Sequence, residues 1–166
     1  MQKMEYHIRP AQREDVPAIL HLVKKLAEYE KLADQMAATE TLFEQNGFGG
    51  NQYFRALLAE SRETEMVRPL GFALYFFTFS TFLGKPTLYL EDLFVLPEFR
   101  GKGIGKSLLV ELGKIARAKK CGRMEWSVLD WNKPAIEFYL RLGAIPMDEW
   151  TVYRLDEQGI ENLVKG

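Results

Sequence analysis

Apolar positions in the first third of the chain follow the spacing of a strand and then that of a helix. Residues 6–8 predict a short strand, because Pro10 pushes the residue before it towards extended geometry. Between positions 16 and 27 the apolar residues recur at helical spacing, at Val16, Ile19, Leu20, Val23, Leu26 and Ala27. A shorter helix is predicted over residues 39–45, closed by the turn residues Asn46 and Gly47.

Aromatic and branched side chains dominate the middle of the chain. Runs over residues 53–59, 70–79 and 87–96 have the composition typical of strands. A polar stretch over residues 60–69 and a Gly-Lys-Pro turn over residues 84–86 separate these runs. Three successive strands with short connections predict an antiparallel meander.

After Pro97 the apolar period becomes helical again. The apolar stripe consists of Ile104, Leu108, Leu109, Leu112, Ile115 and Ala116. The helix is expected to end near the turn residues Cys121 and Gly122. A strand thus passes through a loop over residues 96–105 into a helix, and open α/β sheets bind ligands at the carboxyl ends of their strands.

The last part of the chain continues the alternation. A strand is predicted over residues 124–129, and a helix over residues 134–142 is capped by Gly143. A final strand is predicted over residues 150–155. The second half therefore alternates β, α, β, α, β, which indicates an α/β fold.

Composition narrows the class of ligand. With 166 residues, 47% of them hydrophobic, the chain is expected to form a single domain over residues 1–166. A net charge of −1 supplies no basic field for nucleic acid or an anionic membrane, so a small charged metabolite is the expected partner. One cysteine, Cys121, and the separated His7 and His21 predict no disulfide and no metal site. The absence of an apolar signal segment predicts a cytoplasmic protein.

The loop after the third predicted central strand suits an oxyanion. It consists of Arg100, Gly101, Lys102, Gly103, Ile104, Gly105 and Lys106. Glycines let backbone N–H groups approach an anion, and the helix N-terminus behind them adds partial positive charge, so a pyrophosphate is a suitable ligand. A Walker loop would need glycine in place of Arg100, and a dinucleotide fingerprint would need glycine or alanine in place of Lys106.

Two adjacent carboxylates, Glu91 and Asp92, interrupt an otherwise apolar strand. Strand alternation sends them to opposite faces unless a bulge intervenes. Because a buried carboxylate needs water, a donor or a cation, the pair either belongs to a structural network or binds a cationic ligand.

The loop matches the signature (Arg/Gln)-x-x-Gly-x-(Gly/Ala) and thereby resembles the GCN5-related N-acetyltransferase (GNAT) superfamily. Further segments, in the same order, resemble its spermidine/spermine and thialysine (diamine) N-acetyltransferase branch. These are residues 8–11, 47–49, 89–92, 130–132 and 138–139 with Gly143 and Ala144. The resemblance implies the GNAT acyl-CoA N-acyltransferase fold, a central mixed, mostly antiparallel sheet flanked by helices, and a homodimer.

The resemblance also implies an acetyl-CoA-dependent enzyme that transfers the acetyl group directly to an amine. The implied acetyl-CoA-binding residues are Leu93, Phe94, Val95, Arg100, Gly101, Lys102, Gly103, Ile104, Gly105, Lys106, Asn132 and Tyr139. An alkylammonium has a pKa of about 10.4, so a carboxylate that attracts it and accepts its proton would assist the reaction. Glu91 is the candidate base or water-positioning residue, and Tyr139 is the implied acid that protonates the leaving thiolate.

The expected acceptor is a small diamine, a polyamine or a lysine analogue such as thialysine. The implied acceptor-binding residues are Tyr29, Glu30, Glu91, Asp92, Glu125, Trp126, Ser127 and Glu149. Residues 80–82 read Ser-Thr-Phe where the spermidine/spermine enzymes carry an acidic residue, which favours the thialysine type. Two alternatives stay open, an enzyme that acetylates proteins or peptides and a CoA-binding sensor without catalytic activity.

Overall fold

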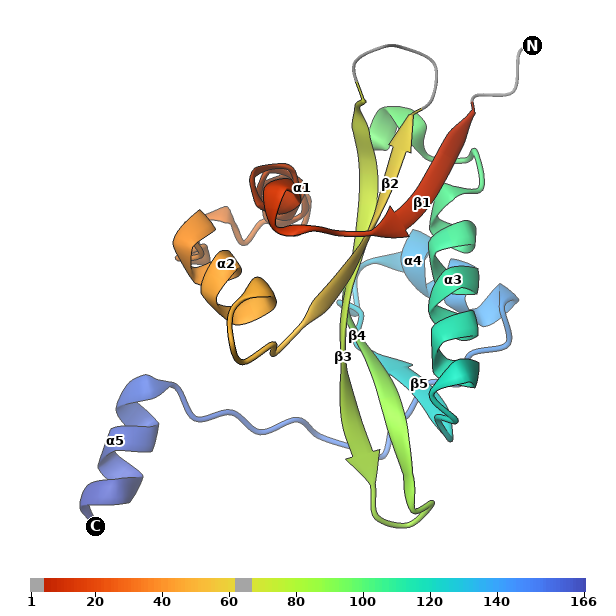
Figure 1. Cartoon of the computed structure of the whole chain (residues 1–166). Helices are drawn as coiled ribbons and strands as arrows, with labels where there is room; N and C mark the ends of the chain where they lie inside the picture. Colours follow the sequence, from red (N-terminus) through yellow and green to blue (C-terminus); the bar gives the residue numbers. More distant parts are fainter. Residues whose placement is uncertain (1–4, 62–66) are drawn as a thin grey trace. The chain divides into compact units, whose positions relative to one another are not determined.

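The computed structural model describes residues 5–61 and 67–166 and divides into two compact units, Met1–Ser127 and Val128–Gly166. The first unit contains a five-stranded sheet (Figure 1). Its strands, in sheet order, are β1 (Tyr6–Pro10), β2 (Arg55–Ser61), β3 (Pro69–Ser80), β4 (Lys85–Val95) and β5 (Arg123–Trp126). The first three pairs are antiparallel and β4 pairs with β5 in parallel, so the predicted mixed, mostly antiparallel sheet is confirmed.

Helices cover both faces of this sheet. Figure 1 shows α1 (Val16–Tyr29) and α2 (Glu40–Phe48) on one face and α3 (Ile104–Ala118) on the other. Short 3-10 turns η1 (Arg13–Asp15), η2 (Ala33–Gln35) and η3 (Pro97–Phe99) connect the elements. No described helix is both long and apolar enough to cross a membrane.

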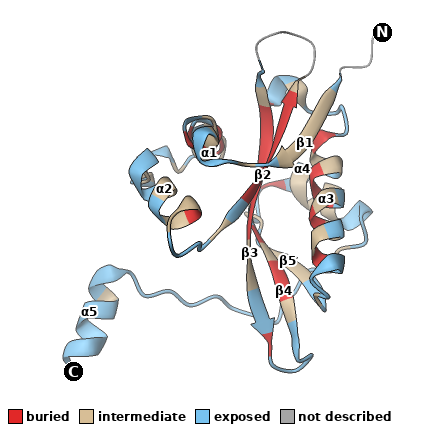
Figure 2. Cartoon of the chain, in the orientation of Figure 1, coloured by how far each residue is buried: buried red, intermediate tan, exposed pale blue. Residues whose placement is uncertain are grey.

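The core beneath α1 joins the helix to the three central strands. Buried residues of this core are Ile19, Leu22, Leu26, Ala56, Leu58, Phe72, Leu74, Phe94 and Leu96. Figure 2 shows the buried positions concentrated along β2 and β3. Most of the predicted stripe of α1 is buried, but Val23 lies at the edge of the core, Ala27 is half-buried, and Leu22 is buried instead. On the opposite face, α3 buries the stripe expected from its sequence except Ile115, which is half-buried.

An ion network anchors the N-terminal end of α1. The guanidinium of Arg9, on β1, donates two hydrogen bonds to the carboxylate of Glu60, at 2.9 and 2.7 Å. It also donates to both oxygens of Asp15, at 2.6 and 2.8 Å, directly before α1. These bonds hold the pKa of Asp15 below its usual value. Arg9 therefore fastens the start of α1 to the edge of the sheet.

Two helix ends differ from those expected. The helix α2 continues to Phe48, because Gly47 lies buried inside it, where a Cβ atom would come within 2.3 Å of the Phe54 ring. The glycine is thus required for close packing rather than for a turn. The helix α3 ends at Ala118, and Lys120, with φ of 55°, takes the left-handed position instead of Gly122.

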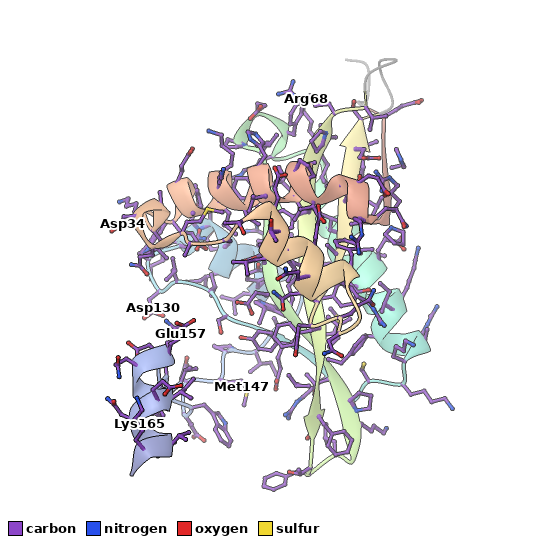
Figure 3. All side chains as sticks on the ribbon, turned by 60° about the vertical axis from the view of Figure 1, so that its left-hand side comes forward. Asp34, Arg68, Asp130, Met147, Glu157 and Lys165 are labelled. Atoms are coloured by element: carbon purple, nitrogen blue, oxygen red, sulfur yellow. The ribbon has the colours of Figure 1, made fainter. Side chains whose placement is uncertain are left out.

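The second unit contains α4 (Lys133–Arg141) and α5 (Glu157–Lys165). The predicted helix over residues 134–142 is confirmed, and Gly143, with φ of 87°, follows its end. The predicted strand over residues 150–155 is wrong, because this segment has no regular structure and leads into α5, which the sequence analysis did not anticipate. In Figure 3, Met147 marks the segment before it, and Glu157 and Lys165 mark the ends of α5. A strand needs a neighbour for its backbone groups, and the second unit has no other strand.

Candidate functional site

A bulge in β4 determines where the two adjacent carboxylates lie. In the pairing of β3 with β4, Leu74 lies opposite Asp92, and the next residue, Tyr75, lies opposite Leu90. Glu91 is therefore the extra residue of a β-bulge. Leu74 belongs to the core beneath α1, so Asp92 lies on the same face. The condition that the sequence analysis attached to the carboxylate pair is thus met by the structure.

Negative charge is concentrated around Asp92. Burial, followed by the charges of Glu91 and Glu30, raises the pKa of Asp92 to about 7. Glu30 caps the C-terminal end of α1, and burial raises its pKa as well. The charges of carboxylates from two separate elements, Glu91 on β4 and Glu30 at the end of α1, thus act on Asp92. Such a cluster favours a cationic ligand, which would lower the free energy of the ionised carboxylates.

The sheet opens beside this cluster. Parallel pairing of β4 with β5 runs only from Thr87 opposite Arg123 to Leu90 opposite Trp126. Beyond Leu90, the only strand that pairs with β4 among the described residues is β3. The backbone of Leu93, Phe94 and Val95, the predicted acetyl-CoA-binding strand residues, therefore borders an edge without a strand partner.

The glycine loop lies between η3 and α3. Gly101 and Gly103 have φ of 74° and 84°, and a Cβ at Gly101 would meet no atom within 4 Å. The glycines thus serve the left-handed backbone rather than close packing. Gly103 is the N-cap residue of α3, and no side chain caps the helix there. The first N–H groups of α3, at Ile104 and Gly105, are consequently available to an anion.

Arg100 extends its side chain from this loop to the α1 face. Its Nε donates a hydrogen bond of 2.9 Å to the backbone carbonyl of Val95. The central carbon of its guanidinium lies 4.4 Å from the centroid of the Tyr29 ring and 5.4 Å from that of Phe94. The family resemblance implied acetyl-CoA binding for Arg100 and acceptor binding for Tyr29, and no sequence pattern indicated their contact. No periodicity relates two residues so far apart in the chain.

Of the predicted acceptor residues, Glu125 and Trp126 lie on β5, and Ser127 directly follows it. Glu125 forms an ion pair of 2.8 Å with Arg123, so its charge is balanced locally. The hydroxyl of Ser127 lies 3.1 Å from that of Tyr89, on β4. Trp126 lies opposite Leu90, at the last paired position before the strands separate. Of the predicted acceptor carboxylates in the first unit, Glu30 and Glu91 thus act on Asp92, whereas Glu125 is ion-paired with Arg123.

Three predicted site residues lie in the second unit. The Oδ1 of Asn132 accepts a hydrogen bond of 3.4 Å from the backbone N–H of Ala135 and so caps α4. Tyr139 lies on α4, and its ring centroid is 5.4 Å from that of Phe138. Glu149 lies in the segment without regular structure before α5. Their approach to the carboxylates of the first unit stays a prediction.

Comparisons with known proteins indicate the family and the fold. The acetyltransferase (GNAT) family matches residues 18–144. A thialysine N-epsilon-acetyltransferase from Sus scrofa is 38% identical over 94% of this chain and 95% of its own length. An L-ornithine N5-acetyltransferase from Arabidopsis thaliana is 30% identical over 98% of this chain and 90% of its own. The structure of an integron cassette protein from V. cholerae superposes with a TM-score of 0.80, at 27% identity, over 98% of this chain and 99% of that chain.

Replacing Asp92 by asparagine should change how stability depends on pH. The pKa of Asp92 is about 7 in the folded state, against 3.8 for an ordinary carboxyl. Asp92 therefore stays protonated to a higher pH in the folded state than in the unfolded state. Wild-type stability therefore falls as pH rises from about 4 to 7, and the Asp92→Asn variant lacks this loss. Since one pKa unit corresponds to about 1.4 kcal/mol, we expect a relative gain of roughly 2–4 kcal/mol for the variant between pH 4 and 8.

Denaturant unfolding of both proteins across this pH range would measure the difference. Asp34→Asn, at an exposed position on η2, provides a control with the same change of charge. Parallel stability profiles for wild type and Asp92→Asn would contradict the raised pKa.

Proposed function

The chain belongs to the acetyltransferase (GNAT) family and is an acetyl-CoA-dependent N-acetyltransferase; on that premise we propose that its acceptor is the side-chain or terminal primary amine of a small diamine, polyamine or lysine analogue such as thialysine. The observation that carries the proposal is the carboxylate cluster of Glu30, Glu91 and Asp92. Thialysine and ornithine, the substrates in the names of similar enzymes, both carry a primary amine at the end of a short chain. A cluster of carboxylates suits such an ammonium group.

The cluster favours binding and deprotonation of the amine. Near pH 7 an alkylamine is almost wholly protonated, because its pKa is about 10.4. The charges of Glu30 and Asp92 attract the ammonium to the α1 side of β4. Glu91, the exposed extra residue of the bulge, then accepts a proton from the nitrogen, directly or through one water. The resulting free amine has the lone pair needed to attack a thioester carbonyl.

Other residues serve the acyl donor, for which acetyl-CoA supplies the thioester. The N–H groups at the start of α3 and the glycine loop suit its pyrophosphate, and Lys102 and Lys106 add positive charge. An N–H group of residues 93–95 that faces the edge of β4 away from β3 would stabilise the oxyanion that forms when the amine attacks. As the carbon–sulfur bond breaks, Tyr139 donates a proton to the leaving thiolate.

The cytoplasmic location, the single domain and the homodimer expected from the sequence belong to this proposal.

Thiol release from acetyl-CoA, measured against a panel of amines, tests the acceptor. The panel contains thialysine, lysine, ornithine, putrescine, spermidine and a lysine-containing peptide, with buffer alone as the blank. We expect turnover with the small amines, highest with thialysine. Residues 80–82 contain no carboxylate that could bind a second ammonium group of a longer polycation. Acetylation of the peptide alone would indicate a protein acetyltransferase. Binding of acetyl-CoA without turnover of any amine would indicate a sensor.

Glu91→Gln should lower the turnover rate strongly at neutral pH and less at high pH. The variant keeps the shape of the side chain but cannot accept a proton, so we expect kcat near pH 7 to fall on the order of 10²-fold. Around pH 10 a large fraction of the amine is already deprotonated, and the difference should narrow. The pH dependence of kcat for thialysine, with the exposed Glu98→Gln as a matched control, measures this. An equal loss at every pH would refute the role of Glu91 in deprotonation.

A further inference from the structure

The contact of Arg100 with Tyr29 joins the glycine loop, which is predicted to bind acetyl-CoA, to the end of α1, which is predicted to bind the acceptor. Arg100 is the first residue of the glycine loop, and Tyr29 is the last residue of α1. The guanidinium lies 4.4 Å from the Tyr29 ring and 5.4 Å from the Phe94 ring, and the two rings lie 6.4 Å apart. The hydrogen bond from Nε to the Val95 carbonyl fixes the side chain on β4. Arg100 therefore connects the end of α1 to β4.

The end of α1 is a place where such a connection matters. Helix ends fray. The residue after the cap, Lys31, adopts a left-handed φ of 60°, which is unfavourable for residues other than glycine. Glu30 forms the cap itself, so its position relative to Asp92 depends on whether this last turn is ordered. A cation at a helix C-terminus also interacts favourably with the helix dipole. Arg100 supplies both a cation and a planar surface at this point.

We propose that Arg100 is a positioning residue for the acceptor, whose stacking on Tyr29 holds the end of α1 and thereby places Glu30 beside Asp92 for amine binding. This inference rests on the proposed function, since it assigns Arg100 a task in binding the amine. Without this side chain, the N–H groups of the glycine turn and of α3 would still be available to an anion. The loop signature itself accepts glutamine at this position, which has no charge to stack on a ring.

Steady-state kinetics of three variants separate the two substrates. Arg100→Gln keeps a donor for the Val95 carbonyl and satisfies the loop signature but removes the cation. Tyr29→Leu removes the ring and retains a good helix former, whereas Tyr29→Phe keeps the aromatic face. We expect KM for thialysine to rise about three- to tenfold in Arg100→Gln and in Tyr29→Leu, as for loss of one cation–π contact. KM for acetyl-CoA should rise less, and Tyr29→Phe should retain more amine affinity than Tyr29→Leu.

The double variant Arg100→Gln/Tyr29→Leu tests whether the two residues act together. If they do, its KM for the amine exceeds that of the more impaired single variant by less than about twofold. Arg68→Gln serves as the matched control. Arg68, labelled in Figure 3, stacks at 4.8 Å on Phe99 and pairs with Glu98, so its contacts lie on η3 rather than on α1. This variant should bind the amine like the wild type.

The possible failures are distinct. An amine KM within twofold of the wild-type value in either single variant, whatever happens to the KM for acetyl-CoA, would overturn the role of Arg100. Independent, multiplicative effects in the double variant would overturn it as well. If the wild type itself turned over none of the amines, the proposed function would be wrong, and this inference would fall with it.

Discussion

Strand β4 has one more residue than β3 at the β-bulge, and the position of this residue, Glu91, determines the geometry of the site. Without the extra residue Glu91, strict alternation would separate the two carboxylates onto opposite faces of the sheet. With it, Asp92 joins the α1 face, where the charges of Glu91 and Glu30 act on it. Directly before this bulge, the paired part of β4 and β5 ends at Leu90 and Trp126. One irregularity thus accompanies both the clustered charge and the open strand edge.

The bulge brings Asp92 under the influence of two other carboxylates, Glu91 and Glu30. Asp92 with a pKa of about 7 is a partly protonated carboxyl at neutral pH, held there by burial and by its acidic neighbours. Elsewhere in the same unit the buried Glu60 is fully engaged by Arg9. The contrast indicates that the fold can pair its acids where stability requires it. Within the described part of the chain, the charges that raise the pKa of Asp92 at the bulge are the acidic Glu91 and Glu30, which supports a binding site for a cationic ligand.

Helix α1 is held at both ends by arginines from the sheet side. Arg9 binds Asp15 before the first turn, and Arg100 stacks on Tyr29 in the last. The core residues between these ends, such as Ile19 and Leu22, pack against β2 and β3. The helix carries Glu30 as its C-cap residue, so contacts at its C-terminal end bear on the position of this carboxylate. The ends of this helix are where small changes in packing would alter the acceptor site most.

Sequence patterns predicted these features to different degrees. The stripes of α1 and α3 were visible because helical periodicity directly reflects burial against a sheet. The bulge was foreseen only as a condition, since alternation within β4 does not reveal its register with β3. The strand expected over residues 150–155 was wrong, because local propensity says nothing about whether a neighbouring strand exists. The contact of Arg100 with Tyr29 joins distant parts of the chain, and no local pattern contains it.

If the carboxylates at the bulge form a cation site, the protonation of Asp92 reports on it directly. Carbon-13 NMR of the aspartate carboxyl groups, with Asp92→Asn to assign the signal, gives the pKa with and without saturating thialysine in the presence of CoA, which prevents turnover. The account predicts a pKa of about 7 in the free enzyme. Bound ammonium should lower it by about one unit or more, because a nearby opposite charge favours the ionised form. An unchanged pKa of Asp92 at full amine saturation would contradict the account.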